Sequence, residues 1–89
     1  MSKDERTPYQ LAVQDVCDEL DAATSTWPPM NSAHEGYGVM AEEWTELEKW
    51  VFTSQKKRDL KEMRYEAIQL AAMAIRFAAE VCNEDVGRR

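Results

Sequence analysis

Apolar residues recur every three or four positions along three stretches of the chain, which is the spacing of one face of an α-helix. The three stretches predict helices over residues 8–24, 34–53 and 60–82. Pro28 and Pro29 interrupt the first connection, because proline lacks an amide donor and restricts the residue before it. The pattern therefore predicts an all-α fold with three main helices in each subunit.

Capping residues stand at the ends of the predicted helices. Thr7 precedes Pro8, a favoured first helical residue, and Asn83 is expected to end the third helix. Ser32 and Glu35 have the spacing of a capping box, in which each side chain bonds to the other residue's amide. The same spacing recurs after Asp59, where a glutamate follows three residues later.

The polar turn at residues 55–58 lets the second and third helices fold back as an antiparallel hairpin. Each of these helices carries an apolar stripe expected to face the core: Tyr37, Met40, Trp44, Leu47 and Val51 on the second, and Leu60, Met63, Ala67, Leu70, Ala74, Phe77 and Val81 on the third. A second stripe on the third helix consists of Ile68, Ala72, Ile75 and Ala79. Because three helices leave that stripe uncovered, it predicts a bundle completed by homo-oligomerisation, as a dimer or a dimer of dimers.

The hairpin also brings acidic residues of the two helices to similar levels. Glu46 and Glu66 each lie about 10 Å from the turn, and Glu43 and Gln69 each lie about 15 Å from it, at about 1.5 Å per residue. Three carboxylates and a carboxamide are thus expected to converge, and like charges this close need a cation to neutralise them. An all-oxygen set favours Mg²⁺, with Mn²⁺ as an alternative. A solvated acidic face is the simpler interpretation of such helices.

Length and charge narrow the classes of function. The 89 residues form one domain, residues 1–89, in which 1–7 and 84–89 are expected to be frayed tails. A net charge of -6 argues against nucleic-acid binding but not against a nucleotide bound through metal ions. The absence of a long apolar stretch argues against a membrane span, and the start of the chain does not resemble a signal peptide, so we expect a cytoplasmic protein with Cys17 and Cys82 as free, partly buried thiols.

Two motifs carry a resemblance to a known family. Glu42, Glu43 and Glu46 form E-E-x-x-E on the second helix, and Glu66 to Gln69 form E-x-x-Q on the third, ahead of an alanine-rich run. Over about residues 30–80 the chain resembles the MazG-like all-α nucleoside triphosphate pyrophosphohydrolases, which have E-x-x-D at the second position.

The resemblance implies Mg²⁺-dependent hydrolysis of a (d)NTP to the (d)NMP and pyrophosphate. It also implies a dimer or a dimer of dimers, since family members form such assemblies. Carried over by position, Glu43, Glu46 and Glu66 would hold the metal, and Glu42 would orient the attacking water. Gln69 would be a neutral fourth ligand in place of the aspartate, one that cannot act as a base.

Three residues outside the motifs are candidate substrate contacts. Trp27 lies beside two prolines, where it would stack on a base or cover the core. His34 is the only histidine, so the chain has neither an E-x-x-H di-iron site nor a nucleophilic triad, and His34 itself would face solvent or substrate. Lys57 lies in the basic turn, where it would attract phosphates or serve only solubility. The alternative function is a non-catalytic helical dimerisation or nucleotide-binding module with a degenerate metal site.

Overall fold

The computed structural model describes residues 3–89 as four helices and the segments that join them. The helices are α1 (Pro8–Thr26), α2 (Ala33–Val51), α3 (Leu60–Glu80) and the short α4 (Glu84–Gly87). No strand occurs among these residues. The predicted all-α fold with three main helices is confirmed, and the predicted helix ends lie within two residues of the observed ones.

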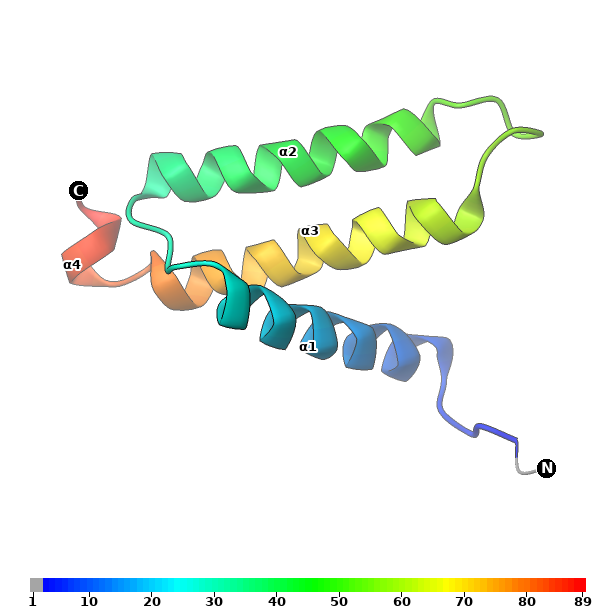
Figure 1. Ribbon diagram of the computed structural model, residues 1–89, viewed down its shortest axis with the longest axis horizontal. Helices are drawn as coiled ribbons and strands as arrows, with labels where there is room; N and C mark the ends of the chain where they lie inside the picture. Colours follow the sequence, from blue (N-terminus) through cyan, green and yellow to red (C-terminus); the bar gives the residue numbers. More distant parts are fainter. Residues whose placement is uncertain (1–2) are drawn as a thin grey trace.

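Helix α3 lies between α1 and α2, which pack on opposite sides of it (Figure 1). The chain is flat, with principal extents of 48 × 35 × 20 Å. Because α1 and α2 each pack against α3 rather than against each other, one face of α3 forms the floor of a cleft between them.

Capping hydrogen bonds fix where the main helices begin. Thr7 and Gln10 form the reciprocal box at α1, with the Gln10 amide donating to Thr7 Oγ1 at 3.1 Å and the Thr7 amide to Gln10 Oε1 at 2.8 Å. At α2 only half of the predicted box forms, because Ser32 Oγ accepts from the Glu35 amide while the Glu35 carboxylate accepts from the amide of Asn31. These local bonds explain why the sequence located the helix starts closely.

The C-terminal segment differs from the expected frayed tail. Helix α3 ends at its C-cap Val81, and Asn83 caps the start of α4 by accepting from the amides of Asp85 and Val86. Val86 packs against the core. At the other end, residues 3–7 precede α1 without helical structure, and residues 1–2 of the expected tail lie outside the described residues.

The fully buried core is small. Its hydrophobic members are Ala23, Met30, Ala72, Met73 and Val81. On α3 the buried face also includes Gln69 and Arg76, which are only 9% and 4% exposed. The central face of α3 is thus partly polar, so its buried groups need partners.

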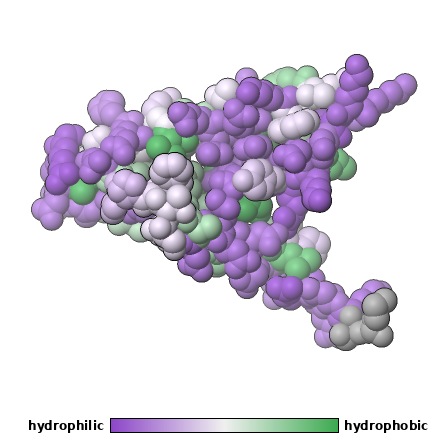
Figure 2. All heavy atoms as spheres, viewed as in Figure 1, coloured by the Kyte–Doolittle hydropathy of each residue, from purple (hydrophilic) through white to green (hydrophobic). Residues whose placement is uncertain are grey.

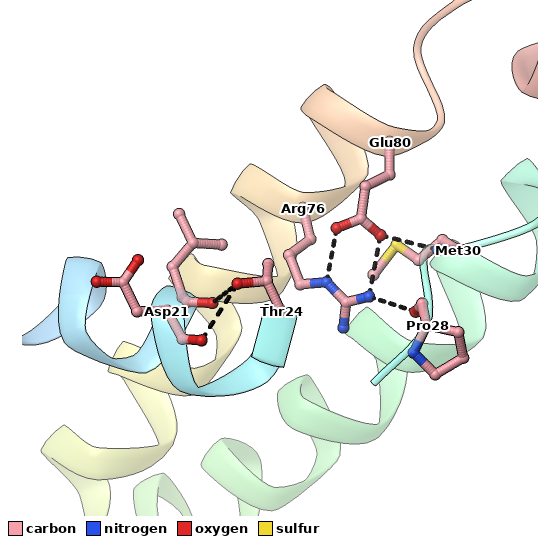
Figure 3. A network of polar contacts seen from close by, with 7 residues as sticks. Asp21, Thr24, Pro28, Met30, Arg76 and Glu80 are labelled. Atoms are coloured by element: carbon pink, nitrogen blue, oxygen red, sulfur yellow. Dashed lines mark hydrogen bonds and ion pairs between the residues drawn. The ribbon is translucent and has the colours of Figure 1, made fainter. Parts of the chain in front are cut away.

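A polar network attaches the segment between α1 and α2 to the end of α3 (Figure 3). Arg76 donates from Nε to Glu80 Oε2 at 2.8 Å and from Nη2 to the Pro28 carbonyl at 2.8 Å. Glu80 Oε1 accepts from the Met30 amide, also at 2.8 Å. The buried guanidinium is therefore paired, and it holds the Pro28–Pro29 turn in place. The acid that pairs with Arg76 lies one turn along the same helix.

The predicted core stripes are wrong in part. Tyr37 and Trp44 on α2 are 69% and 58% exposed, whereas Ala72, assigned to the partner-facing stripe, is 0% exposed. The reason is that α3 packs on two helices at once, so its buried face lies between the two predicted stripes and includes polar Gln69 and Arg76. An apolar periodicity alone predicts only the apolar edges of such a face.

Large hydrophobic residues remain exposed over much of the surface. Besides Tyr37 and Trp44 they include Tyr9, Val13, Trp27, Val51, Phe52, Leu60, Tyr65 and Ile75. On the face shown in Figure 2, hydrophilic residues predominate and hydrophobic ones form small separate groups. Cys17 and Cys82 are free as expected, but both are exposed rather than partly buried. Among residues 3–89 no helix is long and apolar enough to cross a membrane.

Candidate functional site

The cleft between α1 and α2 has a volume of about 380 Å³. Its residues come from α1, from the segment before α2, from α2 and from α3: Glu19, Ala23, Trp27, Pro28, Met30, Glu35, Val39, Glu42, Glu43, Gln69, Met73 and Arg76. Four of them, Trp27, Glu42, Glu43 and Gln69, are residues that the sequence singled out. The cleft therefore brings together half of the eight predicted site residues.

Glu43 and Glu66 meet where α2 packs against α3, and both side chains are half-buried. Burial raises the pKa of Glu43 first, followed by the charge of Glu66 and a hydrogen bond between the two carboxyl groups. The charges of Glu42 and Glu46 raise it further. Two carboxyl groups this close repel each other when ionised, and a cation would stabilise the ionised pair.

Glu46 does not join this pair. Its carboxylate forms an ion pair with Lys49 Nζ at 3.0 Å on the exposed side of α2. The separation of three residues between Glu43 and Glu46 amounts to about 60° around the helix, so when Glu43 faces α3 its neighbour lies at the edge. Within residues 3–89 no group of three or more His, Cys, Asp or Glu side chains is arranged to hold a metal ion. The expected four-ligand cluster is thus reduced to the Glu43–Glu66 pair.

Gln69 lies on the floor of the cleft, one turn of α3 beyond Glu66. It is only 9% exposed, and its Nε2 has no hydrogen-bond partner. A buried amide donor without a partner costs about 1–3 kcal/mol in the folded state. Such a group in a cleft wall is a candidate for contact with a ligand.

The remaining predicted residues divide between the cleft and the outside. Glu42 is exposed and lines the cleft at the edge of α2, and Trp27 lies at the end of α1 with 65% of its surface exposed. His34 is exposed at the start of α2 and is not part of the cleft lining. Lys57 lies in the α2–α3 turn, at the far end of the hairpin from Trp27 (Figure 1). The structure therefore brings neither His34 nor Lys57 to the cleft.

Sequence reasoning missed three charged residues of the cleft. Glu19 had no motif to mark it, and Glu35 was marked only as part of a capping box. Glu19 lines the cleft from α1, which approaches α3 toward its C-terminal end (Figure 1), and Glu35 lines it from the first turn of α2. Arg76 stood out only as a charge inside an apolar run. Its spacing of four residues from Glu80 was the one available signal of their ion pair.

Comparison of the chain with protein families, with curated proteins and with solved structures found no match in any of the three.

Proposed function

We propose that this protein hydrolyses a nucleoside triphosphate to the monophosphate and pyrophosphate with the help of a divalent cation. The observation that carries the proposal is the half-buried Glu43–Glu66 pair beside a cleft with an aromatic residue at its end. The cleft has a volume within the range of small-molecule sites, roughly 300–1,000 Å³. The pair supplies oxygen ligands of the kind that Mg²⁺ prefers.

The residues present fit a cation that is only partly held by protein. Mg²⁺ commonly keeps several waters and binds through one or two carboxylates together with substrate phosphates. Glu43 and Glu66 would be those carboxylates, and the Gln69 Oε1 is a neutral oxygen one turn away. Glu46 would join by leaving Lys49, an exposed ion pair whose loss costs only about 0–1 kcal/mol.

The cation, when bound, would polarise a phosphate and lower the pKa of the attacking water. Glu42 is the base in this proposal, because it is an exposed carboxylate on the cleft wall next to Glu43. Attack of water on the α-phosphorus forms one P–O bond and breaks the bond to the β-phosphate. The products are therefore a nucleoside monophosphate and pyrophosphate.

A second function is supported by a different observation. The exposed side chains of Trp44, Val51 and Phe52, with Leu47 and Glu48, line an apolar groove on the outer side of α2. A surface of this kind fits a helical interaction module, for which the acidic residues would only be solvated. The hydrolase requires a divalent cation for activity, whereas the interaction module does not require one for binding.

Release of pyrophosphate from a panel of ribo- and deoxyribonucleoside triphosphates with Mg²⁺ would test the hydrolase. We expect wild-type turnover and a loss of at least about 100-fold in both Glu43→Gln and Glu66→Gln, since each change removes a charged ligand. Glu5→Gln, at an exposed position before α1 and outside the cleft, is the control and should retain activity. Equal activity in all four proteins, or none in the wild type with Mg²⁺ or Mn²⁺, would contradict the proposal.

A further inference from the structure

We propose that the cleft selects nucleobases that carry an exocyclic amino group, with Gln69 Nε2 and the wall carboxylates of Glu19 and Glu35 reading the base. The class of ligand rests on the proposed function, whereas the selectivity rests on the cleft itself. Cytosine against uracil is the matched comparison, because the two bases differ chiefly in one amino group against one carbonyl.

The first support is the unpartnered donor on the floor. Gln69 is buried to more than nine-tenths, and its Nε2 has no hydrogen-bond partner. A ligand that offers an acceptor here pairs a buried donor that is unpaired in the free protein. The gain in binding free energy is therefore larger than for a hydrogen bond at an exposed site. The Nε2 is available for this contact whichever group the Oε1 of the same amide meets.

The second support is the charge of the walls. Glu19, Glu35, Glu42 and Glu43 line the cleft, and its single basic residue is Arg76. The guanidinium of Arg76 is engaged with Glu80 and the Pro28 carbonyl, and is only 4% exposed. Ionised carboxylates only accept hydrogen bonds. The walls therefore favour a ligand edge that donates hydrogen bonds and disfavour one that presents carbonyl oxygens.

The third support is a positioned aromatic ring. Trp27 is the C-cap of α1, where its amide donates to the Ala23 carbonyl, and its indole is 65% exposed. The next residue, Pro28, is held by Arg76 through its carbonyl oxygen (Figure 3). The backbone is thus fixed at Trp27 and at the residue after it. Ordering the indole ring against a base therefore costs less conformational entropy.

Cytosine meets these three conditions together. Its ring offers an acceptor edge to Gln69 Nε2 and an amino group with two donor hydrogens to Glu19 and Glu35. In uracil the only N–H of the equivalent edge lies between two carbonyl oxygens, which the carboxylates repel. We expect a preference of about tenfold for cytosine, the size of one well-placed hydrogen bond to a buried or charged group.

Titration of the metal-free protein with cytidine and with uridine tests the inference without phosphates or turnover. The ¹⁵N-labelled side-chain amide of Gln69 is the reporter, because it changes environment only if the base reaches it. We expect its resonance to shift with cytidine, and the Kd for uridine to be about tenfold higher. Equal Kd values for the two nucleosides, or cytidine binding that leaves this resonance unmoved, would overturn the inference.

Gln69→Leu sharpens the test, since it keeps the size of the side chain and removes the amide. The preference for cytidine should fall by severalfold, whereas Gln55→Leu in the exposed turn should keep it. If Gln69→Leu does not fold, the wild-type titrations decide alone. Cytidine preference without triphosphate hydrolysis would refute only the hydrolase, and hydrolysis of CTP and UTP at equal kcat/KM, with equal nucleoside affinities, would refute only the selectivity.

Discussion

Glu43 shows how a single carboxyl group links the stability of the fold to its proposed chemistry. Burial and the neighbouring Glu66 raise its pKa, so the folded state binds this proton more tightly than the unfolded chain does. Protonation of Glu43 therefore favours the folded state at low pH. This contribution to the free energy of unfolding declines as the pH rises from the ordinary glutamate range through the raised pKa. Once ionised, Glu43 beside Glu66 destabilises the fold, and a cation would relieve this repulsion.

Glu43→Gln should make the metal-free protein more stable at pH 7, because the amide keeps the hydrogen bond and removes the charge. The difference from wild type should shrink toward zero as the pH falls below the ordinary pKa of glutamate. Urea midpoints at pH 7 and pH 4 would measure this. Glu80, whose pKa is lowered mainly by its hydrogen bond with Arg76, has the opposite pH dependence, but it is common to both proteins and cancels.

The control for this comparison is Glu5→Gln, whose position is exposed in the segment before α1. If this variant shows the same pH-dependent gain as Glu43→Gln, the effect comes from the net charge of the protein and not from the pair. Addition of Mg²⁺ should raise the midpoint of the wild type and of Glu5→Gln while leaving Glu43→Gln nearly unchanged.

At the scale of helices, Gly36 sets how closely α2 approaches α3. A Cβ built at this position would lie 2.6 Å from Phe77 Cδ2 and 3.1 Å from Met30 Sδ. Gly38, two residues later, has nothing within 4 Å of such a Cβ. The two glycines of one helix therefore have different reasons to be there: the first is required by packing, and the second is not.

Gly36→Ala should destabilise the protein by up to about 2 kcal/mol, because the overpacking cost of roughly 1–3 kcal/mol is offset only by a gain of about 1 kcal/mol in helix propensity. Gly38→Ala meets no obstacle and should stabilise by up to about 1 kcal/mol. Thermal or urea unfolding of the pair measures both. Stabilisation of equal size in the two variants would show that Phe77 moves aside at little cost.

The helices themselves followed from the sequence because their starts depend on neighbours in the chain, as at Thr7 and Asp59. The buried face of α3 could not be predicted from the sequence in this way. It is determined by packing against two helices at once, and it includes Gln69 and Arg76. In the site, Glu43 and Gln69 were predictable from helical spacing, whereas the Arg76 contact spans 48 residues to Pro28. No local pattern encodes a contact of that range.

The whole molecule exposes more surface than a compact chain of its size. Its accessible area is 6924 Å², whereas a folded monomer of 10.3 kDa is expected to expose about 5,400 Å². Its radius of gyration is 15.3 Å, against about 12 Å for a compact chain of this length. An excess of about 1,500 Å² per subunit is what an obligate dimer interface would cover.

We therefore expect a homodimer or larger oligomer, measured by sedimentation at micromolar concentration as a mass of at least twice 10.3 kDa. The contact would lie on the side of α2 away from the cleft, because Trp44 is about 200° around the helix from Glu42. Trp44→Glu should dissociate the oligomer, since a charge there would be buried without a partner. Tyr9→Glu changes an exposed aromatic residue on α1 and is the control.

A monomeric wild-type protein at this concentration would rule out the oligomer. Dissociation by both variants would place the contact elsewhere on the surface, and dissociation by Trp44→Glu alone would support the α2 face. The Ile68, Ala72, Ile75 and Ala79 stripe is a weaker basis for the contact than the sequence indicated, because Ala72 is already buried inside the subunit.

The attachment of α1 along one side only has a consequence for the order in which the molecule opens. Helix α1 packs mainly on α3 and makes no extensive contact with α2, so it can detach while the hairpin of α2 and α3 stays closed. Such a partial opening removes the Glu19 wall but leaves Glu43 beside Glu66. Residues of α1 should then exchange their amide hydrogens faster than those of α3, and a ligand that touches both walls would slow that exchange by holding α1 down. Binding of the base and packing of α1 against α3 would then be thermodynamically coupled.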